Sequence, residues 1–317
     1  MNSLKLLIGA LVAGVVLHQA LPAIAQLSSF HQRPIVLDPT YDHTRFAIAP
    51  AENLREFRAF TVSFDSLDDD NGDGSNDVLG IPNWVSHEVK RFEGDCIEAG
   101  DRPSRWFADA ALFADGASPL DASYRYANPF RRYQRDWYVR GHLAMRFLAA
   151  RMGVDAAWNT HTLLNAVPQR RSFNSGIWLD LENLTGAWAQ RYGAVWIMTG
   201  PIVIDQYPSG YIGEPERDEV EVAIPEALFK IVVRETDEAA EQPFDVLAFI
   251  YPQVSAGYTQ RNFDHTRFLT SVDEIEALTE LDFFTNLSEP VESEIESQIA
   301  TELWEASRED QVPACRG

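Results

Sequence analysis

An imidazole, a guanidinium and three oxygen-bearing side chains fall within residues 138–182 of this chain. They are, in chain order, Arg140, His142, Asn165, Asn174 and Glu182. An imidazole can take a proton from water near neutral pH, and amide and carboxylate oxygens suit a hard divalent cation. A guanidinium binds phosphate through paired N–H donors. Together these groups indicate metal-assisted attack of water on a phosphodiester.

Each of these side chains also has a common structural role. A lone histidine such as His142 is more often a hydrogen-bonded structural residue than a base. Asn174 stands at the start of a predicted helix, where asparagine is a favoured cap. Glu182 lies eight residues further on, on about the same helix face, where a solvated surface glutamate is the ordinary interpretation. The chemical interpretation therefore rests on the combination of residues.

The chain is strongly acidic, but its charge is unevenly distributed. The net charge of −22 argues by itself against a nucleic-acid-binding protein. Between residues 131 and 171, however, eight arginines face only two aspartates, a local balance of +6. The arginines are Arg131, Arg132, Arg135, Arg140, Arg146, Arg151, Arg170 and Arg171. Arginine suits bidentate phosphate contact better than lysine does. Such a cluster is usually only solvated surface, but this one brackets the candidate site.

The N-terminus has the pattern of a secretory signal peptide over residues 1–25. It combines a charged start at Lys5, an apolar run over 6–17 and small residues at 23–25. The apolar run is too short to span a membrane comfortably, although an uncleaved N-terminal anchor is the alternative. We therefore expect a mature protein that begins near Gln26, is soluble, and is secreted or periplasmic.

The remaining chain predicts one domain with an extension at each end. An apolar content of 45% and 8 Trp indicate a well-filled core. We expect an N-terminal arm over 26–54, a catalytic domain over 55–285 and an acidic helical C-terminal tail over 286–317. The two cysteines are Cys96 and Cys315. An even count in an exported protein favours a disulfide, which would tie the tail to the domain, over two buried free thiols.

Hydrophobic periodicity predicts an α+β fold with strands and helices intermixed. The predicted strands are 56–64, 81–91, 159–167, 194–201, 220–224, 228–233 and 246–251. Helical spacing of apolar residues predicts helices over 141–153 and 174–192, the second ended by Gly193. The segment 271–307 is acidic and helical in character.

The candidate site also carries a family resemblance. Its fixed positions are Arg140-Gly141-His142, Asn165, Pro168-Gln169, Asn174, Gly176, Trp178, Leu181-Glu182 and Thr199-Gly200-Pro201. This string closely resembles the DNA/RNA non-specific endonuclease family of ββα-metal (His-Me finger) nucleases. Pro82-Asn83-Trp84-Val85 resembles a strand upstream of the site in that family. The resemblance covers roughly residues 55–255 and implies a central, mainly antiparallel sheet flanked by helices.

The resemblance implies a role for each matching residue. His142 resembles the general base, so the rate is expected to fall below about pH 6. Asn174 resembles the sole direct protein ligand of Mg²⁺ (or Mn²⁺), and Glu182 resembles the holder of a metal-bound water. Asn165 resembles a supporting polar residue, and Arg140 an organiser of the site that contacts phosphate.

Three departures from the family pattern concern the loop and the substrate contacts. Val139 stands where the family usually has Asp, and Gly186 where some relatives carry a phosphate-binding arginine. The upstream substrate arginine of the family falls at either Arg102 or Arg105. The phosphate contacts are therefore expected from one of these two arginines, with Arg170 or Arg171 as replacements.

A polar stretch outside the signature resembles a calcium loop. Its oxygen-bearing residues are Asp69, Asn71, Asp73 and Asp77, with Gly74 at the turn. Position 12 is Gly80 and not Glu, which argues against a regular EF-hand. Two interpretations of this stretch therefore stand side by side: a loop that binds structural Ca²⁺, and a solvated acidic turn.

We thus expect an exported, Mg²⁺-dependent, sugar-non-specific endonuclease. Its expected partners are DNA and RNA, with no membrane contact after processing and a homodimer left open. One alternative is a secreted phosphodiesterase that acts on small nucleotides or lipids. The other is a non-enzymatic, Ca²⁺-binding exported protein on the same fold, disabled by Val139.

Overall fold

The computed structural model describes residues 32–65, 79–126, 137–204, 208, 210–217, 219–236, 243–253 and 263–315. Three sequence-based predictions lie outside these residues. They are the signal peptide over 1–25, the calcium loop of Asp69, Asn71, Asp73 and Asp77, and the arginines Arg131, Arg132 and Arg135.

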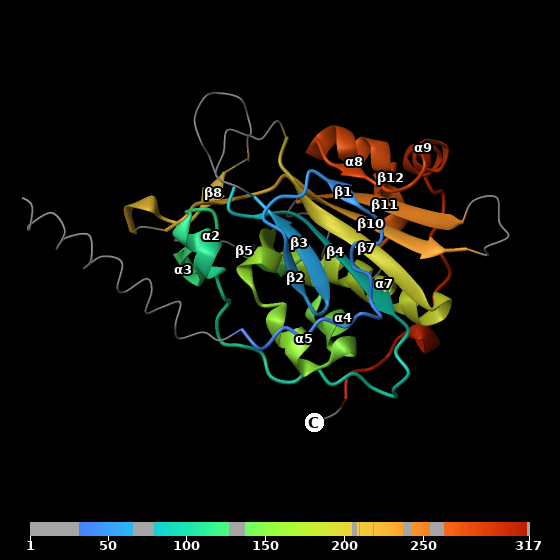
Figure 1. The fold of residues 1–317 in the computed structure, drawn as a ribbon, viewed down its shortest axis with the longest axis horizontal. Helices are drawn as coiled ribbons and strands as arrows, with labels where there is room; N and C mark the ends of the chain where they lie inside the picture. Colours follow the sequence, from blue (N-terminus) through green and yellow to red (C-terminus); the bar gives the residue numbers. More distant parts are fainter. Residues whose placement is uncertain are drawn as a thin grey trace, which may run out of the picture.

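A seven-stranded sheet forms the centre of the molecule, with strand order β12-β11-β10-β7-β4-β3-β2 (Figure 1). Every neighbouring pair in it is antiparallel. Its strands are β2 (Arg55–Phe57), β3 (Phe60–Phe64), β4 (Pro82–Lys90), β7 (Ala194–Ile202), β10 (Ala227–Glu235), β11 (Phe244–Pro252) and β12 (Leu269–Thr270). Smaller two-stranded sheets pair β1 (Ile48–Ala49) with β13 (Asp282–Phe283), β5 (Tyr138–His142) with β6 (Ala166–Arg170), and β8 (Tyr211–Ile212) with β9 (Val222–Ala223). The predicted α+β fold with a central antiparallel sheet is confirmed.

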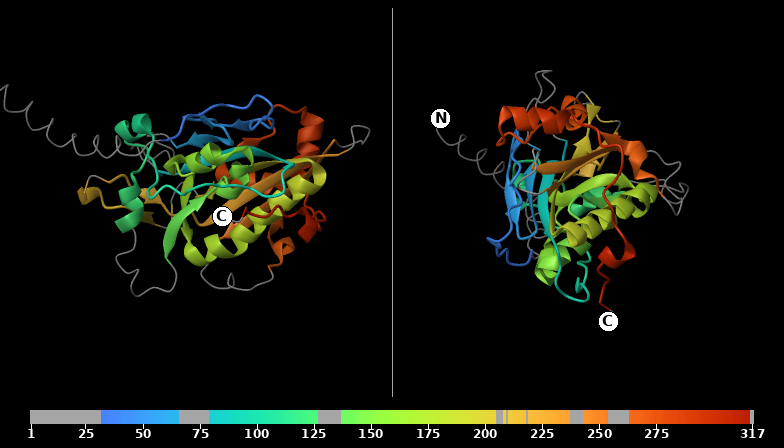
Figure 2. Two further views of the ribbon diagram at one scale, coloured as in Figure 1. Left: turned by 90° about the horizontal axis from the view of Figure 1, so that it is seen from below. Right: turned by 90° about the vertical axis from the view of Figure 1, so that its right-hand side faces the viewer.

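Both faces of the sheet are covered, which divides the apolar interior into two cores. Along β10, Leu228 and Val232 join one core, while Phe229 and Ile231 join the other. This alternation follows from the two-residue repeat of a strand. Helix α7 (Leu179–Tyr192) covers the first core, and α8 (Val272–Thr279) with α9 (Glu289–Ser297) covers the second, as Figure 2 shows.

The remaining helices are short and lie in the connections. The α-helices are α2 (Ala110–Ala114), α3 (Asp121–Tyr126), α4 (Arg146–Ala149), α5 (Val154–Asn159) and α6 (Arg171–Phe173). The 3₁₀ turns are η1 (Ala150–Met152), η2 (Leu163–Asn165), η5 (Pro215–Arg217), η6 (His265–Phe268) and η7 (Arg308–Asp310), and η3 (Asn174–Trp178) is a π-helical turn. In the part of the chain that the structure describes, no helix is long and apolar enough to cross a membrane.

Three predicted elements differ in the structure. The helix predicted over 141–153 begins only at Arg146, because residues 141 and 142 end strand β5, and it finishes as the 3₁₀ turn η1. Residues 56–64 form a hairpin of β2 and β3 and not one strand, because the chain reverses between Phe57 and Phe60. The strand predicted over 159–167 is wrong: this segment contains the end of α5 and the turn η2. Apart from a single bridge between Thr162 and Phe107, its strand pairing begins at Ala166. The Thr162 hydroxyl accepts a hydrogen bond from the Leu164 amide and caps this turn, a local competition that hydrophobicity does not reveal.

Both chain extensions pack onto the domain. The predicted N-terminal arm buries Phe46 and Ile48 in the second core. Within its described residues, the C-terminal tail is helical at α9 and η7. The helical character predicted over 271–307 holds for α8 and α9. Cys96 and Cys315 form the expected disulfide across 219 residues, and the Ile97 amide beside it donates to the Pro313 carbonyl at 2.8 Å.

Candidate active site

The hairpin of β5 and β6 places His142 at its last register pair, opposite Ala166. Asn165 holds the chain that follows His142 through its buried side-chain amide. Its Oδ1 accepts from the Ala144 amide at 2.7 Å, and its Nδ2 donates to the carbonyls of Ala144 and Thr160, both at 3.0 Å. Because both ends of this amide bind backbone groups, Asn165 positions the loop and leaves the chemistry to other residues.

His142 lies half-buried among aromatic rings and cations. The Trp106 and His161 ring centroids are 4.4 and 4.9 Å from that of His142. Burial, then the charges of His161, Arg102 and Arg146, hold the His142 pKa well below its usual range. His142 is therefore neutral at pH 7, the protonation state that a general base requires.

His161 shares this environment. Burial, then the charges of Arg102 and Arg146, lowers the His161 pKa to about 4. The Thr160 hydroxyl lies 3.4 Å from His142 Nε2 and 3.5 Å from His161 Nδ1. Sequence reasoning missed His161 and Trp106, because both lie outside the family string. Only their aromatic type could have marked them as candidates.

Arg140 finds its carboxylate partner on a separate helix. Its Nη1 lies 3.3 Å from Oδ1 of Asp121 in α3, and the same oxygen accepts from the Trp106 amide at 3.3 Å. Val139, at the position where the family usually has Asp, pairs with Gln169 across the hairpin. Asp121 thus fixes Arg140 and Trp106 together without a carboxylate at position 139.

Gly141 permits a close approach that orients Asn174. A side chain at position 141 would place its Cβ 2.0 Å from Cδ of Gln169, so only glycine fits there. The Oε1 atom of Gln169 then accepts a hydrogen bond from Nδ2 of Asn174 at 2.6 Å. With its nitrogen engaged by Gln169, the Asn174 side chain retains its oxygen as an available ligand atom.

Asn174 does not cap the helix as its ordinary role would suggest. It follows the single turn of α6 and begins the π-helical turn η3, whose backbone departs from helical geometry at Gly176. No side-chain capping bond forms at η3 or at α7. Turns of this kind recur at functional sites, because they re-aim side chains within an otherwise regular helix.

Glu182 and Lys230 are buried groups of opposite charge that act on each other electrostatically, although no ion pair joins them among the described contacts. They are only 6% and 1% exposed, and Oε1 of Glu182 has no hydrogen-bond partner among the described residues. Burial raises the pKa of Glu182 to about 8 and lowers the pKa of Lys230 to about 8, and each charge opposes the shift of the other. Glu182 is therefore not the solvated surface residue of its ordinary interpretation.

Trp178 connects this pair to the hairpin. Its indole Nε1 donates to the His142 carbonyl at 3.3 Å, and its ring lies under the Lys230 ammonium at 4.3 Å from the centroid. A Trp178 hydrogen bond also lowers the pKa of Glu182. Sequence reasoning missed Lys230, although a lone lysine inside the apolar strand 228–233 is a recognisable signal.

These side chains fit the divalent cation that the resemblance implies. Asn174 offers a neutral amide oxygen, and Glu182 a buried carboxylate oxygen without a protein partner. Both are oxygen ligands of the type that Mg²⁺ and Mn²⁺ prefer. A buried carboxylate with an unsatisfied oxygen is costly unless a cation or a held water completes its shell.

The candidate phosphate-binding arginines separate into two groups. Arg102 is exposed, and its charge lowers the pKa of both His142 and His161, which places it on the imidazole side. Arg105 is also exposed. Arg146 donates to the carbonyls of Ala99 and Gly100 at 2.6 and 2.7 Å and so holds the loop that leads to Arg102.

The second group is at the opposite end of the hairpin. Arg170 lies over the Tyr138 ring at 5.2 Å, and Arg171 over the Trp137 ring at 5.0 Å. Ala166 is the register partner of His142, and Arg170 lies four positions further along β6, a span of about 13 Å. Arg170 and Arg171 can thus contact substrate only some distance from the imidazole.

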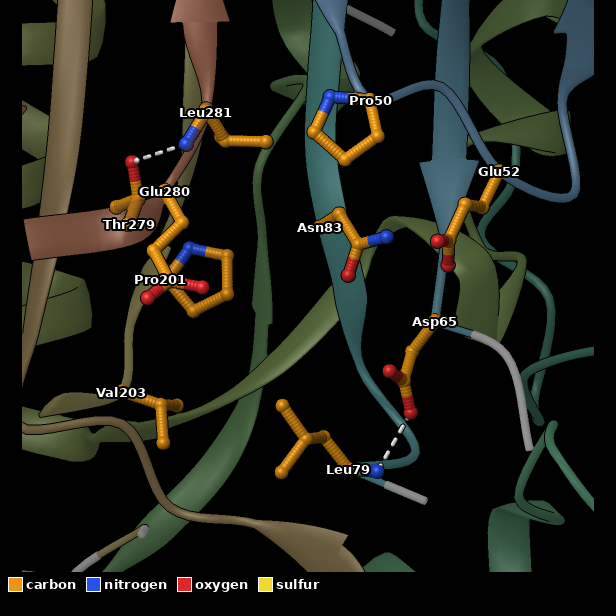
Figure 3. A pocket seen from close by; sticks show the side chains of 10 residues that line it. All are labelled: Pro50, Glu52, Asp65, Leu79, Asn83, Pro201, Val203, Thr279, Glu280 and Leu281. Atoms are coloured by element: carbon orange, nitrogen blue, oxygen red, sulfur yellow. Dashed lines mark hydrogen bonds between the residues drawn. The ribbon is translucent and has the colours of Figure 1, made fainter. Parts of the chain in front are cut away.

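A hollow of about 160 Å³ lies elsewhere, between Asn83 of β4 and the end of α8 (Figure 3). Asp65 lines it and accepts a hydrogen bond from the Leu79 amide across the base of the 66–78 loop. None of the residues that line it belongs to the His142 cluster. We therefore place the candidate active site at the hairpin and not in this hollow.

The hairpin, the helix that follows it and the sheet behind them define a class of protein, the ββα-metal nucleases. The chain belongs to the DNA/RNA non-specific endonuclease family, whose sequence profile matches residues 52–289. Members of this family are phosphodiester hydrolases.

Named relatives and a solved structure agree with this assignment. A nuclease of Nostoc sp. (strain PCC 7120) is 25% identical over 307 residues, covering 93% of this chain and 97% of the relative. The Serratia marcescens nuclease is 26% identical, over 71% and 76% of the two chains. The human mitochondrial nuclease EXOG is 27% identical over 49% of this chain, which spans only 42% of that protein.

One solved structure with a similar fold is EndoG in its complex with EndoGI. It superposes with a TM-score of 0.56 at 19% identity, covering 75% of this chain and 87% of EndoG. At this identity the likeness concerns the fold alone.

Proposed function

We propose that this protein is an exported, metal-dependent endonuclease that hydrolyses DNA and RNA without regard to the sugar. The observation that carries the proposal is the neutral His142 at the end of the hairpin, beside arginines and above the buried Glu182. Family membership supports the nuclease chemistry. The substrates, the metal and the export of this chain are parts of the proposal.

In the proposed reaction, His142 takes a proton from a water molecule whose oxygen attacks phosphorus. The P–O3′ bond breaks, so the products carry a 5′-phosphate and a free 3′-hydroxyl. Asn174 would hold Mg²⁺ or Mn²⁺ directly, and Glu182 would hold a water bound to it. When bound, the cation neutralises charge on the phosphate and on the departing oxygen.

The arginines supply contacts to the phosphodiester backbone. Arg140, fixed by Asp121, and Arg102, on the imidazole side, are the arginines that we assign to the scissile phosphate. Contacts to phosphate carry no sequence information, which agrees with action on both DNA and RNA. The acidic remainder of the chain limits non-productive binding elsewhere on the surface.

Export is supported by the leader pattern and by the disulfide. Disulfides persist in oxidising compartments and are rare in the cytosol. The bond of Cys96 to Cys315 joins the end of the tail to the domain, so it contributes to the folded state of the mature protein. We propose a secreted or periplasmic location.

The test is incubation of the purified protein with plasmid DNA, with RNA and with bis(p-nitrophenyl) phosphate, each with Mg²⁺ or with EDTA. We expect cleavage of both polymers with Mg²⁺ only, and ends that DNA ligase accepts because they keep the 5′-phosphate. Hydrolysis of the small ester alone would favour a phosphodiesterase of small substrates. No hydrolysis with Mg²⁺ or Mn²⁺ would contradict the proposed function.

A further inference from the structure

A second group of carboxylates lies on the other face of the sheet, among α8, β13 and α9. Two sets of three side chains bring one oxygen each to within 4.8 Å of one another. The sets are Asp273, Glu276 and Glu296, and Asp282, Glu292 and Glu296. Glu296 belongs to both, so it occupies the centre of the cluster. Figure 1 shows α8 and α9 side by side above the sheet.

Glu296 is buried in a way that an ordinary surface acid is not. It is only 8% exposed, and its Oε1 has no hydrogen-bond partner among the described residues. Burial of a carboxylate is costly unless a cation or hydrogen-bond donors compensate the charge. This unsatisfied oxygen points to a ligand independently of the clustering.

In the part of the chain that the structure describes, no protein cation compensates these acids. Within the described ranges, none of the five carboxylates forms an ion pair with a basic side chain. Burial, and after it the charges of the other four acids, raises the pKa of Glu296 to about 8. Every charge that acts on it is therefore of the same sign.

The spacing of the acids along their helices is unfavourable without a cation. Asp273 and Glu276 are three residues apart on α8, and Glu292 and Glu296 are four apart on α9. Like charges at these spacings destabilise a helix. Glu276 is further fixed in place, because its Oε1 accepts from the Phe283 amide at 2.8 Å.

We propose that this cluster, centred on Glu296, binds a divalent cation of the Ca²⁺ class. Ca²⁺ takes six to eight oxygen ligands in flexible geometry, which suits carboxylates contributed by two helices and a strand. Mg²⁺ demands near-ideal octahedral geometry and keeps its waters, so it fits a multi-carboxylate cluster less well. The ion would join α8 to α9 and so fasten the C-terminal segment over the second core.

The competing explanation is a shared proton. Glu276 and Glu296 lie within hydrogen-bonding reach of each other, so one carboxyl could donate to the other. A proton would remove one charge and leave the remaining acids as uncompensated neighbours. The two explanations predict opposite effects of Glu296→Gln, because glutamine mimics a protonated glutamate but is a much weaker Ca²⁺ ligand.

The experiment uses the full-length protein freed of metal with EDTA. Thermal unfolding and calorimetric titration with CaCl₂ are compared for the wild type, Glu296→Gln and Glu294→Gln, an exposed acid of α9 outside the cluster. Repeating the series in Asn174→Ala removes the ligand assigned to the catalytic metal. We expect Ca²⁺ to raise the Tm of the wild type and of Glu294→Gln, and Glu296→Gln to lose one bound ion and most of that rise.

Two results would overturn the proposal. One is a Glu296→Gln protein with the full Ca²⁺ response. The other is a wild type that neither binds Ca²⁺ nor gains stability from it. A Glu296→Gln protein that is then at least as stable at pH 7 would assign a shared proton. If Glu296→Gln fails to fold by circular dichroism, Asp273→Asn and Glu292→Gln take its place. Each should weaken Ca²⁺ at least about tenfold, and unchanged affinity in both would also refute the site.

Discussion

The two faces of the sheet each bury a glutamate with an unsatisfied oxygen, but in different electrostatic surroundings. On the α7 face, Glu182 lies opposite the buried Lys230. On the α8–α9 face, the charges that act on Glu296 all come from acids. Residue type and burial are thus the same, and the neighbouring charges differ. The comparison teaches that a buried carboxylate is interpreted through its counter-charge: Glu182 has a protein cation in its surroundings and is proposed to assist at the Asn174 site, whereas Glu296 is proposed to bind a cation from solution.

The largest expected difference between the two faces comes from removing the Asn174 side chain. We predict that Asn174→Ala abolishes productive Mg²⁺ binding, because no other neutral oxygen ligand is assigned to the site. Glu182→Gln should weaken Mg²⁺ more mildly, by about 10- to 100-fold, as expected for a residue that acts through a water. Mg²⁺ titrations of nuclease activity measure both effects. An unchanged Mg²⁺ midpoint in Asn174→Ala would place the metal elsewhere.

The base on the α7 face gives the next largest effect. His142→Ala should lose about 10²- to 10⁴-fold in rate while DNA binding survives, as expected when a general base is removed. Single-turnover cleavage and a binding assay in EDTA measure the two properties separately. Glu294→Gln on the opposite face serves as the control and should keep the wild-type rate. Near-full activity of His142→Ala would contradict the proposed role of His142 as the general base.

Lys230→Met tests the counter-charge directly. It leaves Glu182 buried without a nearby cation, so the free energy of unfolding should fall, by less than the about 3–5 kcal/mol that breaking a contacting buried ion pair costs. The cost should grow with rising pH, because the raised pKa of Glu182 means that a proton replaces the lost cation at lower pH. Urea unfolding in EDTA measures it. Lys90→Met is the comparison. The Lys90 side chain pairs with Glu88 but is itself partly exposed, so the loss of unfolding free energy should be smaller, less than about 1 kcal/mol.

The pH profile distinguishes Arg102 from Arg105. The lowered pKa of His142 keeps this base neutral below its ordinary titration range, so the acid limb of kcat/KM should lie at lower pH than an unperturbed imidazole would give. Arg102→Gln removes a cation that lowers this pKa and should move the acid limb to higher pH. Arg105→Gln should leave the limb in place. Equal shifts in both variants would show that their charges act on His142 alike.

The smallest expected effect concerns Arg170 and Arg171. Changing both to Gln should weaken DNA affinity and flatten the plot of log affinity against log salt by up to about two units, since each phosphate contact contributes about −0.9. Cleavage by the bound enzyme should change little, because these side chains stack on Trp137 and Tyr138 away from the imidazole. A wild-type salt slope would mean that the substrate groove lies on another face.

Sequence reasoning succeeded where the determining interactions are local. The apolar repeat from Ile177 to Trp188 predicted the helix that became α7, and Gly193, whose φ is +99°, ends it. It failed over 159–167, where the Thr162 cap and the Asn165 side chain stabilise a turn in apolar sequence. Side-chain hydrogen bonds to the backbone can override hydrophobic pattern, and residue spacing does not encode them.

The sequence by itself determined the family and predicted the candidate base and the proposed metal ligands, because Arg140 to Glu182 are close enough in the chain for a hairpin and one helix to assemble them. Only the tertiary structure decided what surrounds them. Asp121 reaches Arg140 from α3, and Lys230 reaches Glu182 from β10, at positions that no local repeat connects to the motif. The five acids around Glu296 likewise meet only when α8 and α9 pack together. Burial and counter-charge are properties of such packing, and they set the pKa of each group.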